Sequence, residues 1–91
     1  MMHHIQVERV LRETLRTPYR DLVTRPTGRA VRSSIQTALA EGEATLACLD
    51  FSCVGLVDFS CADEVVAKLL LDPPAGTFVL LQGLTEEQLV A

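Results

Sequence analysis

The sequence predicts one small α/β domain over residues 1–91, with a mostly parallel or mixed sheet of about four strands flanked by helices. The length of 91 residues is that of a single domain. An apolar fraction of 48% without any Trp indicates a core built from Leu, Val, Ile and Ala. Near-continuous apolar runs alternate with amphipathic segments, a pattern typical of parallel strands joined by helical crossovers.

The first half of the chain predicts two helices. Residues 5–16 form an N-terminal helix, because one apolar stripe recurs at helical spacing and comprises Val7, Val10, Leu11, Thr14 and Leu15. Pro18 ends this helix, and residues 22–24 follow as a short strand. Thr27 is the expected N-cap of a second helix, which Gly42 ends with a left-handed cap. The apolar stripe of that helix comprises Ala30, Val31, Ile35, Ala38 and Leu39.

The second half alternates strands and helices. Residues 44–51 are apolar almost throughout, which predicts a central strand buried on both faces. Ser60 is expected to cap a third helix, whose buried side comprises Ala62, Val65, Val66, Leu69 and Leu70. Residues 77–81 predict a further buried strand. Thr85 and Gln88 have capping-box spacing and open a helix over 85–91 that the chain end truncates, so the domain core spans about 19–84.

The charge is unevenly distributed along the chain. The net charge is −4, yet residues 1–32 carry seven Arg against three acids and residues 33–91 carry one Lys against nine acids. Nucleic-acid binding is not expected, because no aromatic side chains stand among the arginines to stack on bases. No apolar run reaches the roughly 20 residues that span a membrane. The first residues do not resemble a secretory signal, so a cytoplasmic location is expected.

The cysteines predict no metal site or disulfide. Cys48, Cys53 and Cys61 are odd in number and lack CxxC spacing, which favours reduced, buried thiols. A zinc site that combines them with His3 and His4 is the alternative, but structural zinc usually takes closely spaced ligand pairs. No cofactor and no metal are expected.

One segment carries a family resemblance. The stretch 49–64 reads Leu-Asp-Phe-Ser-Cys-Val-Gly-Leu-Val-Asp-Phe-Ser-Cys-Ala-Asp-Glu. A strand ending in Leu-Asp-Phe-Ser, followed by a second Asp that opens a helix with small and polar residues, resembles the STAS domains of bacterial anti-sigma-factor antagonists. The likeness is greatest to the uncharacterised STAS-like branch, specific over 48–70 and looser over 19–84. The repeated Asp-Phe-Ser-Cys at 50–53 and 58–61 is too closely spaced for a structural repeat.

The resemblance implies a sheet of four or five strands flanked by helices, with no enzymatic activity and no cofactor. It also implies docking on another protein, such as an anti-sigma-factor kinase, through the helix start that matches residues 58–61. Partner contacts are therefore expected at Asp58, Phe59, Ser60, Asp63 and Glu64. In antagonists, a serine directly after the aspartate is phosphorylated to break the complex. Phe59 occupies that position here, and the candidate acceptor Ser60 stands one residue later.

The same residues allow other interpretations. Ser60 is also a preferred N-cap, and Phe59 is either an exposed docking anchor or a core residue, the preferred interpretation being core. The carboxylates of Asp58, Asp63 and Glu64 suit a metal or acid–base site, but first-turn acids and a Glu64–Lys68 ion pair explain them as ordinary helix features.

Three functions follow from the sequence. The first is a non-enzymatic protein-interaction module in bacterial transcriptional or stress regulation. The second is a structural fragment or dimerisation domain of a larger regulator, with no phospho-switch. The third is a redox or enzymatic role for Cys61, whose place at a helix start is expected to lower the thiol pKa. A homodimer is a separate possibility, with the amphipathic first helix packed on a second copy.

Overall fold

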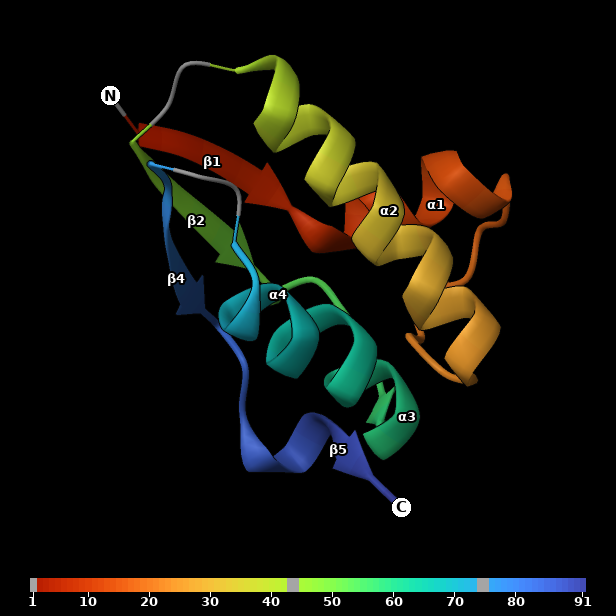
Figure 1. Ribbon diagram of the computed structural model, residues 1–91. Coiled ribbons are helices and arrows are strands. Elements are labelled where there is room, and N and C mark those ends of the chain that lie inside the picture. The colour runs from red at the N-terminus through yellow and green to blue at the C-terminus, as the bar shows by residue number, and fades with distance from the viewer. Residues whose placement is uncertain (1, 43–44, 74–75) are drawn as a thin grey trace.

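The computed structural model describes residues 2–42, 45–73 and 76–91 (Figure 1). The elements in chain order are β1 (Met2–Gln6), α1 (Val7–Leu15), α2 (Arg25–Glu41), β2 (Leu46–Asp50), β3 (Val57–Asp58), α3 (Phe59–Cys61), a π-helical segment (Ala62–Ala67), α4 (Lys68–Leu71), β4 (Phe78–Gln82), a 3-10 helix (Glu86–Gln88) and β5 (Leu89–Val90). The residues from α3 through α4 form one uninterrupted helical stretch, 59–71. The predicted α/β class is confirmed.

The strands form two small parallel sheets. The first has the order β1-β2-β4, and its register sets Met2, Leu46 and Phe78 side by side in one row. In the second, β3 pairs with β5, and Leu22 adds a single bridge to Val57. Parallel pairing and the central place of β2 are as predicted. The single sheet of about four strands is wrong, because the chain leaves β2 and forms its next strand in a second sheet.

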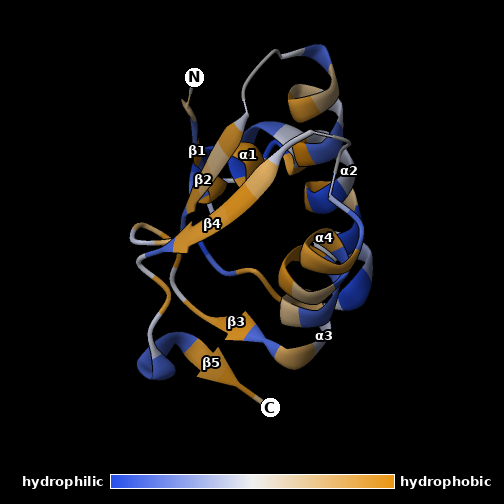
Figure 2. Ribbon diagram, turned by 60° about the vertical axis from the view of Figure 1, so that its left-hand side comes forward, coloured by the Kyte–Doolittle hydropathy of each residue, from blue (hydrophilic) through white to orange (hydrophobic). Residues whose placement is uncertain are grey.

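The core lies on one side of the three-stranded sheet. Strand residues Ile5, Ala47 and Leu49 are buried there. The helical residues packed with them include Leu11, Val31, Ile35, Leu39, Val65 and Leu69. Figure 2 shows α2, α3 and α4 together on that side of the sheet. The strand predicted over 77–81 forms as β4, but its exposure alternates, with Phe78 and Leu80 exposed, so the prediction of a buried strand is wrong.

The N-terminal helix prediction, 5–16, is right only from Val7 onward. Residues Met2–Gln6 form strand β1, because they pair along the whole length of β2. Local sequence indicates this strand only weakly, because Met2 and Ile5 are the only apolar residues among its five. Long-range pairing with a buried strand decides its conformation.

The second helix begins earlier than predicted. Its N-cap position is Thr24, with Pro26 in the first turn where proline is well tolerated, so Thr27 is not the cap. The helix does end at Gly42. That residue has extended backbone angles (φ −88°, ψ 165°), so the predicted left-handed cap is wrong.

The end of the chain forms no truncated helix. The predicted capping box of Thr85 and Gln88 exists, but it opens only a 3-10 turn, and the chain then pairs as β5 with β3. The Gln88 side chain explains this, because its Nε2 donates hydrogen bonds to the carbonyls of Phe51 (2.9 Å) and Val54 (2.8 Å). These bonds fix the tail across the β2–β3 connection.

Candidate protein-interaction site

Asp58 connects the start of α3 to the start of α2. Its Oδ1 accepts hydrogen bonds from the Cys61 amide and the Ser60 hydroxyl, both at 2.8 Å. Its Oδ2 accepts one from the Thr24 amide at 2.7 Å. Burial acts to raise the pKa of Asp58, but the two amide hydrogen bonds outweigh it and hold the pKa below its usual value. Asp58 is therefore an ionised N-cap that also ties down a residue 34 positions away in the chain.

Thr24 is held in an uncommon backbone conformation. Its φ is 71°, in the left-handed region that β-branched residues rarely occupy. The hydrogen bond to Asp58 stabilises this conformation. A strained residue thus lies at the junction of α2 and α3, and such strain is common at functional sites.

Phe59 lies at the surface and not in the core. Its side chain follows the ionised cap directly and remains 63% exposed. The preferred sequence interpretation, a core phenylalanine, is therefore wrong. Phe51 occupies the same place in the first Asp-Phe-Ser-Cys sequence, at 50–53, and is fully buried. The local sequence therefore does not decide whether the phenylalanine is buried.

Ser60 is half-buried and is not the N-cap. Asp58 takes that role, and Ser60 lies within the first turn with its hydroxyl donated to the Asp58 carboxylate. The sequence interpretation of Ser60 as the cap was wrong by two residues. Its hydroxyl donates to the Asp58 carboxylate, and the negative charge of that carboxylate would repel any acidic group added at the Ser60 oxygen.

Glu64 lies beneath the surface, surrounded by cations. Its side chain has no exposed area, and its carboxylate oxygens lie 2.9 Å from both Lys68 Nζ and Arg25 Nη1. Two further guanidinium groups, of Arg32 and Arg29, lie at 3.3 and 3.9 Å. The hydrogen bonds from Lys68 and Arg25 outweigh desolvation and lower the pKa of Glu64 to about 2. Glu64 thus anchors α2 to the helical stretch 59–71 and does not itself present a contact surface.

Close helix packing brings these charges together. A Cβ on Gly28 would lie 2.9 Å from Cys61 Cα and 3.1 Å from Glu64 Cβ, so only glycine allows α2 to approach this closely. Asp63 lies at the edge of the contact, 45% exposed, and binds Arg25 at 2.7 Å. Glu64 and Asp63 both belong to the π-helical segment, a local widening that is frequent at functional sites.

Cys61 is a buried structural thiol. Its Sγ donates to the Thr24 carbonyl at 2.8 Å. Desolvation and then the negative charge of Asp58 raise the thiol pKa to about 12. The expectation that the helix start lowers this pKa is wrong, because the cap carboxylate and burial outweigh the helix dipole. Cys48 is also buried, but Cys53 is exposed, contrary to the prediction for all three thiols.

The structure thus brings four of the five predicted contact residues to one accessible helix start: Asp58, Phe59, Ser60 and Asp63. Sequence reasoning missed the residues that support them from α2 and its N-cap, namely Thr24, Arg25, Gly28, Arg29 and Arg32. The spacing of the three arginines at i, i+4 and i+7 places them along one side of a helix and was the available signal.

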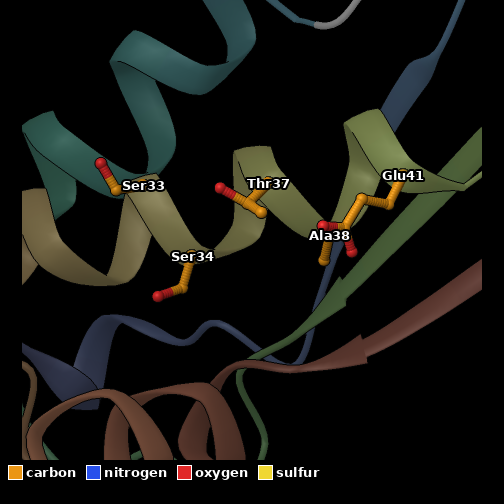
Figure 3. Close-up of a pocket in the computed structure, with 5 residues that line it drawn as sticks. All are labelled: Ser33, Ser34, Thr37, Ala38 and Glu41. Carbon is orange, nitrogen blue, oxygen red and sulfur yellow. The ribbon is translucent and has the colours of Figure 1, made fainter.

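One surface hollow is lined by a single helix and groups no histidine or thiol among its lining residues. It has a volume of about 390 Å³ and runs along α2, and Figure 3 shows that all its labelled side chains come from that helix: Ser33, Ser34, Thr37, Ala38 and Glu41. These residues include hydroxyls and one carboxylate. Within residues 2–42, 45–73 and 76–91, no three His, Cys, Asp or Glu side chains are grouped so as to hold a metal ion. Over those ranges, no helix is long and apolar enough to cross a membrane.

No protein-family model matches the chain, and comparisons with curated proteins and with solved structures also give no match. The resemblance of residues 48–70 to STAS domains stays a prediction.

Proposed function

We propose that this chain is a STAS-like, non-enzymatic interaction module that docks on another protein through the start of α3. The observation that carries the proposal is the 63% exposed Phe59. A large aromatic side chain next to a hydrogen-bonded cap is the kind of anchor that dominates protein interfaces. Ser60 and Asp63 surround it with polar groups, and Glu64 supports the surface from below.

The partner class we propose is an anti-sigma-factor kinase, in a bacterial pathway of transcriptional or stress regulation and in the cytoplasm. This choice rests on the resemblance over residues 48–70. The exposed ring of Phe59 among polar groups is compatible with a partner surface that offers an apolar pocket with a polar rim.

Phosphorylation of Ser60 is the proposed switch. A phosphate adds a charge of about −1.5 to −2 at neutral pH. The Ser60 oxygen lies 2.8 Å from the Asp58 carboxylate, so the two negative groups would repel each other. The displaced carboxylate would release the Thr24 and Cys61 amides and change the surface around Phe59.

Affinity capture from cells that produce the chain tests this proposal. The baits are tagged wild type, Phe59→Ala, Ser60→Asp, Ser60→Ala and the control Leu71→Ala, which removes an 84% exposed apolar side chain on α4. We expect a kinase-like or sigma-linked protein to bind wild type, Ser60→Ala and Leu71→Ala, and to be lost with Phe59→Ala and Ser60→Asp. Identical captures with all five baits would exclude this site.

A further inference from the structure

The described helices leave the second face of the three-stranded sheet open (Figure 2). The register of β1, β2 and β4 places alternate residues of each strand on this side, which we call the open face: Met2, His4, Gln6, Leu46, Cys48, Asp50, Phe78, Leu80 and Gln82. The described helices lie on the other side of the sheet (Figure 2). Parallel sheets are almost always covered on both faces, so this arrangement is incomplete for a parallel sheet.

The apolar part of the open face is contiguous. Met2, Leu46 and Phe78 form one row across the three strands, and Leu80 lies in the next row beside Cys48. The exposed fractions are 59% for Met2, 76% for Phe78 and 52% for Leu80. Contiguous exposed apolar side chains of this size usually mark an interaction surface.

We propose that the open face is a homodimer interface, covered by the open face of a second copy. The charges on this face allow two copies to approach. Asp50 is the one carboxylate on this face; it is 6% exposed and lies within 3.7 Å of His4 and 3.3 Å of the Gln6 amide. Two copies of a chain with net charge −4 repel each other over most of their surface. The apolar rows can meet without bringing like charges face to face.

The geometry of the face is compatible with two-fold symmetry. A two-fold axis that lies between the two sheets, parallel to β2, brings the same patch of each copy face to face, so the patch must be self-complementary. The row of Met2, Leu46 and Phe78 has side chains of different size at its two ends. A two-fold rotation sets the large Phe78 of one copy toward the smaller Met2 of the other.

The area of the face can also be compared with that of known interfaces. The exposed apolar side chains of Met2, Phe78 and Leu80 offer roughly 370 Å² of surface per copy, taking about 200 Å² for each fully exposed side chain. With the flanking His4, Leu46 and Gln82, the buried total for two copies is on the order of 1,000 Å², at the low end of specific interfaces. We therefore expect a weak dimer, with a Kd on the order of 10–100 µM.

Sedimentation equilibrium over about 5–500 µM, which brackets that Kd, tests the proposal. Wild type is expected to rise from the monomer mass of 10.0 kDa toward twice that value. Phe78→Glu and, as a second variant, Leu80→Glu place carboxylates in the interface, so each is expected to weaken the dimer at least tenfold. Both side chains are more than half exposed, and circular dichroism checks that the variants fold.

Leu71→Glu is the matched control, because it introduces the same charge at an 84% exposed leucine on α4, on the helical side of the sheet. It is expected to dimerise like wild type. A wild-type mass that stays at 10.0 kDa throughout the range overturns the proposal, as does equal dimerisation of Phe78→Glu and wild type. Neither result bears on the Phe59 site, which lies on a different element.

Discussion

Replacement of Asp58 by alanine removes three hydrogen bonds at the junction of α2 and α3. Loss of an Asp N-cap costs about 1 kcal/mol. The bond from the Thr24 amide to a charged acceptor adds about 1 kcal/mol, below the roughly 1.5–3 kcal/mol typical of such bonds, since Thr24 is exposed and water can replace the carboxylate. We expect Asp58→Ala to lower the free energy of unfolding by about 2 kcal/mol, and Tm by about 10 °C for a domain of this size.

Urea unfolding followed by circular dichroism measures this loss, with Asp58→Asn as the matched variant. Asparagine keeps an acceptor oxygen that caps a helix as well as aspartate does, so the expected loss is about 0.5–1 kcal/mol. If Asp58→Ala loses less than about 0.5 kcal/mol, the three bonds do not stabilise the junction as argued. Equal losses for the two variants would assign the effect to charge and not to capping.

Two further predictions concern ionisation. The folded-state pKa of Glu64 is about 2, below its ordinary value of 4.5, so Glu64 stabilises the fold in full above pH 4.5 and this contribution is lost as the pH falls toward 2. In pH titrations of stability, the difference between wild type and Glu64→Gln should therefore shrink across that window, and a constant difference would contradict the assignment. For the thiols, brief iodoacetamide treatment of the native protein at pH 8 should label Cys53 and leave Cys61 unmodified, because Cys61 is buried with a pKa of about 12. Mass spectrometry of peptides reads this out, and rapid native labelling of Cys61 would contradict its burial.

Local sequence patterns predicted the elements with strong periodicity. The apolar stripe of α2 and the apolar run of β2 are examples, and each pattern continues over several residues. Strands β1 and β5 were not predicted, because neither has alternating apolar residues over its length. Their conformation depends on pairing with strands about 30–45 positions away in the chain, which local propensity does not encode.

The candidate site was predicted in position but not in its internal contacts. The Asp58–Glu64 segment was identified from its motif, and the i, i+4 pair of Glu64 and Lys68 was visible in the sequence. The three arginines of α2 stand 32 to 39 positions before Glu64, and Gly28 alone allows the helices to approach. The Glu64–Lys68 pair, which the sequence predicts at the helix surface, therefore has a fully buried carboxylate that joins α2 to the helical stretch 59–71.

The placement of the three phenylalanines supports two separate interaction surfaces. The chain has no Trp and three Phe, of which Phe51 is buried, while Phe59 and Phe78 are 63% and 76% exposed. Burial of an aromatic side chain stabilises a small domain by about 2 kcal/mol or more, and the isolated chain does not gain this stabilisation at Phe59 and Phe78. Phe59 lies at the start of α3 and Phe78 on the open face of the sheet, away from the helical layer. A dimer through the open face would leave Phe59 exposed on both copies. The dimer would then present two Phe59 sites, one on each copy.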